Sequence, residues 1–339
     1  MRRSALLIPL ICGVVSPIAS WSAGNSSMAV QAFGQGEFMR TFSVQPRGKL
    51  VMDVGLGSIE VKTIEDHQIV VEVFRNVGKP RRSQPEDILR RHEVIFEHNS
   101  NDLVIRARFA ENGLEGMYRY ELGVRYVVSI PSEFNIDLRT SGGNISVSNL
   151  RGEVRTLTSG GSLYFGRIEG PVKGLTSGGS INLTGCNGKT SLKTSGGGIY
   201  IASSAGEVSA EASGGVIKIE NFLGNVFARN DGGGIKADRI SGSIDASTSG
   251  GPVDVALNEQ PKKNCRLFSF GGGITVELEE TLSLNIEADV SGGSVFSELP
   301  MTIQWPARED ALLAKLNAGG PTLALQANGG SVRLRKLRR

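Results

Sequence analysis

The sequence is poor in the residues that build reactive centres. Its 339 residues include three histidines, three cysteines and two tryptophans, and aromatic residues make up 6% of the chain. His67, His92 and His98 show no metal-site spacing with Cys or carboxylates, and no Gly-x-Ser-x-Gly elbow lies beside them. We therefore expect solvated surface histidines, no metal site, no cofactor and no hydrolase nucleophile.

The cysteines do not indicate a disulfide. Cys12 lies in the N-terminal segment. Cys186 and Cys265 are separated by more than four of the 18-residue repeats that are described below. At the spacing of neighbouring strands this is on the order of 20 Å, whereas a disulfide requires Cα atoms within about 7 Å. We expect both later cysteines to be small buried apolar residues.

Long hydrophobic runs are missing after the first residues. Residues 1–23 combine Arg2 and Arg3, an apolar run and small residues near Ala19, which predicts a cleaved secretory signal peptide. The run is too short to span a bilayer. A lipoprotein anchored through Cys12 is an alternative, although Ile11 stands where a lipobox has a small residue. We expect an exported bacterial protein, periplasmic or at the cell surface, with no transmembrane segment after signal cleavage.

Charge of one sign is also scarce. The formal net charge is +3 and basic residues do not interleave with aromatic ones, so we expect no nucleic-acid partner. The C-terminal residues 333–339 are strongly basic. They could contact anionic envelope polymers, or they could form a charged strand that discourages edge-to-edge stacking.

Glycine, by contrast, is abundant and periodic. A Gly-Gly pair returns every 18 residues from residue 142 to residue 250, and a second glycine keeps the same interval from Gly152 to Gly242. A fixed period shared by two glycine positions is typical of stacked repeats. The period therefore predicts the architecture before any other pattern does.

The residues between the glycines alternate as in a strand with one buried face. Two apolar columns, from Ile145 to Val253 and from Val147 to Val255, flank a polar column. A helix would lose about 1 kcal/mol at each glycine. We predict an all-β, single-stranded parallel β-helix, or β-solenoid, with 18-residue coils and less regular caps. Its parts are the signal peptide (1–23), a strand-rich N-terminal part (24–140), the regular repeat (141–300) and a C-terminal coil with the basic tail (301–339).

Two short helices are expected outside the regular repeat, over Pro85–His92 and over Pro306–Asn317. The Thr-Ser that precedes five of the glycine pairs has two interpretations. It could be a hydroxyl ladder that binds a regular surface, or a column of turn hydroxyls bonded to backbone and adjacent coils. Ala212 and Asp231 interrupt the ladder, which favours the second interpretation.

The glycine phrases do not match ligand-binding loops. No Lys-Ser/Thr follows them as in a phosphate loop, and apolar residues occupy the aspartate place of a calcium-binding repeat. A polysaccharide-active β-helix enzyme remains an alternative. Its acid and base residues would come from a set that lies in different columns: Lys218, Lys236, Asp238, Asp245 and Asp254.

The order of these motifs resembles a known family, the "toastrack" or putative adhesin domains of bacterial envelope proteins. The resemblance covers about residues 42 to 337 and rests on Val128-Ser-Ile-Pro131 followed by repeated T-S-G-G-x-I-x-V with an intervening G-x-V. It implies a right-handed parallel β-helix and an adhesin-like or envelope-stress scaffold role. It supplies no catalytic residues.

The function that we expect is non-enzymatic. An exported, adhesin-like solenoid would bind a surface polysaccharide or an envelope protein through its exposed strands. The candidate binding residues are Tyr164, Tyr200, Lys218 and Lys236, which supply stacking and charge. A periplasmic envelope-stress scaffold with a protein partner is the alternative.

Overall fold

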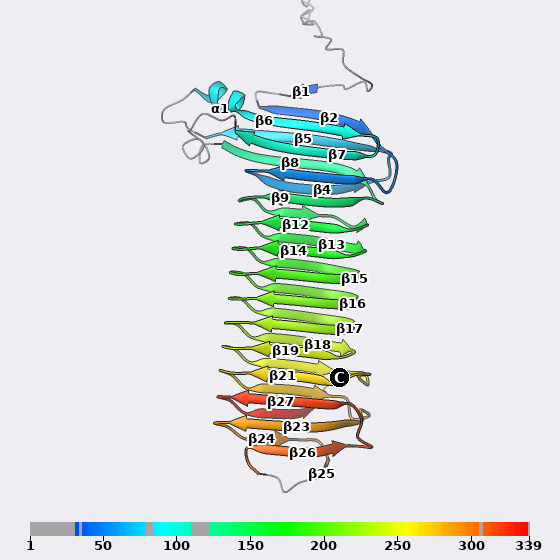
Figure 1. The fold of residues 1–339 in the computed structure, drawn as a ribbon, viewed down its shortest axis with the longest axis vertical. Coiled ribbons are helices and arrows are strands. Elements are labelled where there is room, and N and C mark those ends of the chain that lie inside the picture. The colour runs from blue at the N-terminus through cyan, green and yellow to red at the C-terminus, as the bar shows by residue number, and fades with distance from the viewer. Residues whose placement is uncertain (1–30, 34–35, 79–83, 110–121, 305–307, 338–339) are drawn as a thin grey trace, which may run out of the picture.

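The described part of the chain is a single elongated stack of strands with one short helix (Figure 1). The computed structural model describes residues 31–33, 36–78, 84–109, 122–304 and 308–337. The expected signal peptide, Cys12 and the last two residues of the basic tail lie outside these residues. Among the described residues, no helix is long and apolar enough to cross a membrane.

The strands form two broad faces of a flattened solenoid. Face 1 carries the Gly-Gly-x-Ile phrases, and face 2 carries the strands that end in the next Thr-Ser. From the N-terminal end of the stack, face 1 consists of β1 (Gln31–Phe33), β2 (Glu37–Ser43), β5 (Gln68–Val77), β8 (Leu122–Pro131), β4 (Ser58–Ile64), β10 (Ile145–Val147), β13 (Leu163–Glu169), the first parts of β15 (Ile181–Thr194), β16 (Ile199–Ala212) and β17 (Ile217–Asn230), then β18 (Ile235–Ser241), β20 (Val253–Leu257), β22 (Ile274–Leu278), β28 (Val332–Lys336) and β24 (Val295–Ser297).

Face 2 has the same direction of stacking. It consists of β6 (His92–Asn99), β7 (Asp102–Phe109), β3 (Lys49–Val54), β9 (Asn135–Thr140), β12 (Val154–Thr158), β14 (Val172–Thr176), the last parts of β15, β16 and β17, then β19 (Ile244–Thr248), β21 (Cys265–Ser269), β27 (Thr322–Asn328), β23 (Leu284–Ser291), β26 (Ala311–Leu316) and β25 (Thr302–Ile303). The two-residue strand β11 (Leu150–Arg151) lies at a corner between the faces.

The register of the strands confirms the 18-residue coil. On face 1, Ile145 pairs with Leu163, and Leu163 with Ile181, in parallel ladders. On face 2, Thr158 pairs with Thr176, and Thr176 with Thr194. Each residue therefore lies above its own counterpart in the previous coil, which is why the apolar columns of the sequence become continuous ridges.

The core fills the space between the two faces. The inward residues of successive coils are almost inaccessible to solvent; Ile181 and Val208 are both 0% exposed. Burying one such side chain contributes about 1.5–3 kcal/mol. Cys186 and Cys265 are free and buried, as expected for small apolar residues. Thr190, the polar member of its column, is also buried.

The two kinds of repeating glycine have different physical causes. The corner glycines have positive φ, for example +117° at Gly206 and +133° at Gly224, a conformation that other residues rarely adopt. The second glycine of each pair is required by crowding between coils. A Cβ on Gly161 would lie 2.0 Å from the carbonyl oxygen of Gly143, whereas a Cβ on Gly142 would meet no atom within 4 Å.

The coils at the N-terminal end do not stack in chain order. The coil of β3 and β4 is inserted between β7 and β8 on one side and β9 and β10 on the other. Antiparallel pairs of β2 with β5, β5 with β8, and β6 with β7 then cover the end of the stack. Strands that are distant in sequence therefore hold this end together.

The C-terminal end repeats this arrangement in reverse. The last coil in sequence, β27 and β28, is inserted between β21 and β22 and the coil of β23 and β24. Figure 1 shows red β27 between β21 and β23. The glycine phrases at Gly271 and Gly292, 21 residues apart in the sequence, are therefore not neighbours in space; the phrase at Gly329 lies between them.

One of the two expected helices is present. The helix α1 (Pro85–Arg91) has proline at its start, acidic residues in its first turn and basic residues in its last turn. The helix expected over Pro306–Asn317 is wrong, because Ala311–Leu316 forms β26, antiparallel to β23. The segment is rich in helix formers, but burial of Ala314 and Leu316 beside β23 overrides that weak preference.

Candidate functional site

The threonines of the Thr-Ser ladder are structural. The Thr176 Oγ1 donates a hydrogen bond to the Gly161 carbonyl in the previous coil (2.7 Å) and accepts one from the Gly179 N–H (3.2 Å). The hydroxyls of Thr158, Thr194 and Thr248 repeat the first of these bonds. These threonines are buried, so their hydroxyls are not available to a ligand. The backbone-bonding interpretation of the column is the one that the structure supports.

The interruption of this column at Asn230 keeps the same bonds. The Asn230 Nδ2 donates to the Gly215 carbonyl (2.6 Å), and its Oδ1 accepts from the Gly233 N–H (3.1 Å). An amide carries both a donor and an acceptor, so it replaces the hydroxyl function. Ala212 alone offers neither.

The structure places all four sequence-predicted residues in one outward row on face 1. Tyr164 and Tyr200 are separated by the strand of Asn182, and Lys218 and Lys236 follow on the next two strands. Tyr164 is 43% exposed. The row is therefore a ladder of side chains along the stack. Tyr164 and Tyr200 are not on neighbouring strands, because Asn182 lies between them.

Tyr200 and Lys218 are joined to each other through Glu220. The Tyr200 hydroxyl donates to the Glu220 carboxylate (2.7 Å), the Lys218 Nζ lies 2.6 Å from it, and the same Nζ lies 5.4 Å from the Tyr200 ring centroid. These hydrogen bonds lower the pKa of Glu220 and raise those of Lys218 and Tyr200. The Tyr200 hydroxyl and the Lys218 ammonium group, two of the predicted binding groups, are thus already bonded to the Glu220 carboxylate.

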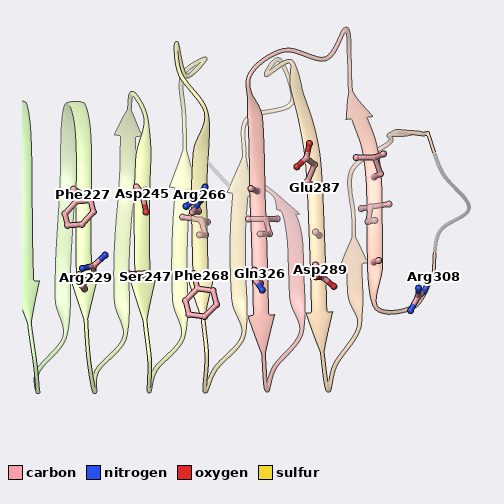
Figure 2. Close-up of a pocket in the computed structure, with 17 residues that line it drawn as sticks. Phe227, Arg229, Asp245, Ser247, Arg266, Phe268, Glu287, Asp289, Arg308 and Gln326 are labelled. Carbon is pink, nitrogen blue, oxygen red and sulfur yellow. The ribbon is translucent and has the colours of Figure 1, made fainter.

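A groove of about 1030 Å³ lies on the opposite side of the stack, on the outer surface of face 2 near the C-terminal end. It crosses six strands, β17, β19, β21, β27, β23 and β26 (Figure 2). Its outward side chains form two rows that are in register from strand to strand. One row is Phe227, Asp245, Arg266, Ala324, Glu287 and Leu313, and the other is Arg229, Ser247, Phe268, Gln326, Asp289 and Ala311.

The inserted strand β27 shapes this groove. It brings Ala324 between Arg266 and Glu287, and Gln326 between Phe268 and Asp289. A methyl side chain leaves the centre of the first row low, while longer side chains stand on both sides. The swapped order of the last coils is therefore what creates the groove.

The two phenylalanines of the groove lie with their ring faces toward the solvent side, since Figure 2 shows both rings face-on in a view onto the strands. Both side chains are half-buried. The Arg229 guanidinium carbon lies 5.4 Å from the centroid of Phe227. A flat, supported aromatic ring is a surface on which an apolar ligand face can stack.

The charges of the groove are balanced, with three arginines (Arg229, Arg266, Arg308) and three acids (Asp245, Glu287, Asp289). At the rim, Arg308 forms a bidentate pair with Asp310 at 3.0 and 2.8 Å. This bond lowers the pKa of the Asp310 carboxyl and raises that of Arg308.

The charged side chains on the groove floor are not paired as Arg308 and Asp310 are. Asp245, Arg266 and Glu287 make no salt bridge within 4.0 Å to any residue that the structure describes. The described residues also contain no group of three or more His, Cys, Asp or Glu that could hold a metal ion. The groove therefore offers charged donors and acceptors that are not paired with one another.

Sequence reasoning missed this groove. It named Asp245 as one candidate acid, but it did not consider the outward columns of face 2 as a binding surface, where Phe227 and Phe268 stand at outward, half-buried positions. Those two aromatics were a usable signal. The position of Ala324 beside them was not, because the pairing of β21 with β27 joins residues that are far apart in sequence.

The histidines correct a second expectation. His67 is exposed, but His92 is 4% exposed and His98 is half-buried. The His92 Nε2 lies 3.2 Å from the Tyr126 hydroxyl, and its ring packs against Phe109. Burial, with a smaller contribution from the nearby positive charge of Arg75, lowers the pKa of His92 to about 4. The expectation failed because β6 lies between α1 and β7 and its first residue points inward.

Comparison with known proteins gives matches among solved structures only. The chain matches no protein-family model and no curated protein. It is similar to a putative adhesin from Bacteroides fragilis (12% identity, 89% of this chain and 98% of that chain, TM-score 0.35). It is similar to a putative lipid binding protein from Parabacteroides distasonis (12%, 88% and 97%, TM-score 0.41). A putative cell adhesion protein from Clostridium sporogenes is also similar (11%, 88% and 99%, TM-score 0.22).

Proposed function

We propose that this protein is a non-enzymatic, adhesin-like binding module that is exported to the bacterial envelope. In this proposal the groove on face 2 holds a surface polymer or a protein partner. The observation that carries it is the pair of flat phenylalanine rings beside unpaired charged groups, on a rigid stack of strands. Concave sites with apolar surfaces and a few polar groups are where proteins usually bind ligands.

The positions of the acids support a binding role over a catalytic one. Asp245 and Glu287 are separated by three strand spacings, or about 14 Å. The paired carboxyl groups of glycoside hydrolases are about 5–9.5 Å apart. Glu287 and Asp289 are closer, but they lie side by side on one strand and are both exposed. A catalytic acid is usually kept protonated by an apolar pocket.

Retention on isolated cell envelopes of the producing bacterium tests the binding site. We expect the double variant Phe227→Ala/Phe268→Ala to be retained at least tenfold less than the unmodified protein. The matched double variant Tyr164→Ala/Tyr200→Ala changes face 1 only and should be retained normally. The opposite result would reject the groove and restore the face 1 row as the binding site.

Protease treatment of intact cells tests the location, with a known periplasmic protein as the leakage control. Digestion of this protein alone supports a role outside the cell, as in adhesion. Protection until the outer membrane is opened instead supports the alternative, a periplasmic scaffold with a protein partner.

A further inference from the structure

We propose that the groove on face 2 binds a neutral polysaccharide chain, which lies across the strands and stacks on Phe227 and Phe268. The inference rests on the proposed function, because it takes the groove as the binding site. It adds the chemical class of the ligand. Four properties of the groove carry it: the orientation of its rings, the kind of hydrogen-bonding groups, the balance of charge and the length.

The rings provide the apolar contact. Phe227 lies on β17 and Phe268 on β21, with β19 between them, and the two residues occupy different rows. Their backbones are therefore at least two strand spacings apart, about 10 Å. Both present ring faces outward (Figure 2). The C–H face of a pyranose ring is flat and apolar, so successive sugars of one chain can stack on the two rings.

The hydrogen-bonding groups of the groove are side chains only. The backbone groups of β19, β21, β27 and β23 already bond to one another within the sheet. An extended peptide that binds by strand addition requires free backbone groups at a sheet edge, and the centre of face 2 has none. Sugar hydroxyls donate and accept, so they suit a mixed set of carboxylates, guanidinium groups and the Gln326 amide.

The charges select against an ionic ligand. Three guanidinium groups and three carboxylates line the groove, and Arg308 is already paired with Asp310, so the groove has no excess of positive charge. A polyanion would gain from the arginines but would be repelled by Asp245, Glu287 and Asp289, which alternate with them along the rows. A neutral hydroxyl-rich chain meets no such repulsion and still receives hydrogen bonds to charged groups, the stronger kind.

The length of the groove suits a chain more than a single sugar. From β17 to β26 it crosses five strand spacings, or about 24 Å. The same geometry leaves a monosaccharide with contact to only one phenylalanine.

Calorimetric titration with soluble hexasaccharides tests the inference. The probes are cellohexaose, maltohexaose and laminarihexaose, with a hexamer of galacturonic acid as the acidic comparison. We expect at least one neutral hexasaccharide to bind and the acidic one to bind at least tenfold more weakly than it. Phe227→Ala and Phe268→Ala should each weaken binding at least tenfold, and Glu287→Gln several-fold. Tyr164→Ala, on face 1, should leave binding unchanged.

Phe268→Trp keeps a flat ring and guards against a loss of binding through misfolding. It should bind the hexasaccharide within a few-fold of the unmodified protein. Binding of the acidic hexamer alone, or equal binding by the two alanine variants and the unmodified protein, would overturn the assignment. Binding of none of the four probes would overturn it as well. If retention on envelopes still depends on Phe227 and Phe268 in that case, the proposed function stands and its ligand is not a neutral glycan.

Discussion

Gly142 and Gly161 occupy the two places of the Gly-Gly pair in neighbouring coils, yet only one of them has room for a methyl group. At Gly161 the added Cβ would lie 2.0 Å from a carbonyl oxygen, and at Gly142 it would meet nothing within 4 Å. We expect Gly161→Ala to lower the free energy of unfolding by about 3 kcal/mol, at the upper end of ordinary substitutions. Gly142→Ala should change it by less than about 0.5 kcal/mol. Chemical denaturation of both variants checks the prediction, and equal effects would show that crowding between coils is not the cause.

The buried hydroxyl of Thr176, two residues before the next glycine pair, allows a second prediction about stability. Thr176→Val keeps the shape and removes both bonds to Gly161 and Gly179. The unpaired backbone groups left behind should cost about 1–3 kcal/mol. Ser177→Ala, an exposed neighbour, is the control and should be neutral. Thermal unfolding measures both, and a neutral Thr176→Val would mean that the column is not held by these bonds.

His92 makes stability depend on pH. Its pKa is about 4 in the folded protein and about 6.5 in an unfolded chain. Between these values the unfolded chain binds the proton more readily, so the contribution of neutral His92 is complete above pH 6.5 and is lost as the pH falls toward 4. The difference is worth up to about 3 kcal/mol.

The measurement is the free energy of unfolding at pH 7 and at pH 4.5 in the unmodified protein and in His92→Phe. The variant should lose less stability over this interval, because the titrating group is gone. His67→Gln, which removes an exposed histidine, should behave like the unmodified protein. Identical slopes in all three proteins would contradict a role for His92.

Among the elements, the inserted coil of β27 and β28 joins strands that precede it at different distances in the sequence. It pairs on one side with β21 and β22 and on the other with β23 and β24. A chain that ends after Asn317 would leave β21, β22 and β23 paired on one side only and β24 without its partner β28, and it would remove Ala324 and Gln326 from the groove. We expect it to melt at a much lower temperature and to be cleaved first between residues 284 and 317.

Limited proteolysis with mass spectrometry checks this prediction against the full-length chain. Cleavage confined to the new C-terminus, with the rest of residues 284–317 protected, would show that β23 and β24 do not depend on the inserted coil. Unpaired edges also invite aggregation, so the truncated chain should be examined at low concentration.

The elements also show how far the sequence could predict the structure. The columns from Ile145 to Val255 fix the strands, their register and the buried face, because each coil contacts only its sequence neighbours. At the two ends this rule fails, since β3 and β27 pair with strands distant in sequence. Local preference was no guide there: the segment of β26 is helix-forming by composition but pairs with β23. The groove depends on the same non-local pairings, so only its two phenylalanines were visible beforehand.

At the scale of the whole molecule, the regular coils are interchangeable and the two ends are not. Removing residues 180–197 deletes one 18-residue coil and joins Gly179 to Gly198. Leu163 should then pair with Ile199 in place of Ile181, and Val172 with Val208 in place of Thr190. The core columns stay apolar and both interlocked ends are untouched. We expect this shortened protein to fold, with the strand signal of the unmodified protein in circular dichroism.

The groove lies on strands from β17 onward, so the shortened protein should also bind the hexasaccharide that the full chain binds. Removal of residues 180–188 is the matched control. It deletes half a coil, so every later strand is displaced to the opposite face relative to the coils before it, and the inserted ends no longer meet their partners. We expect that protein to aggregate or unfold, because a stack built from in-register columns tolerates the loss of a whole period but not of half of one. If both deletions fold equally well, or if neither does, the coils are not the independent repeating units that the 18-residue register implies.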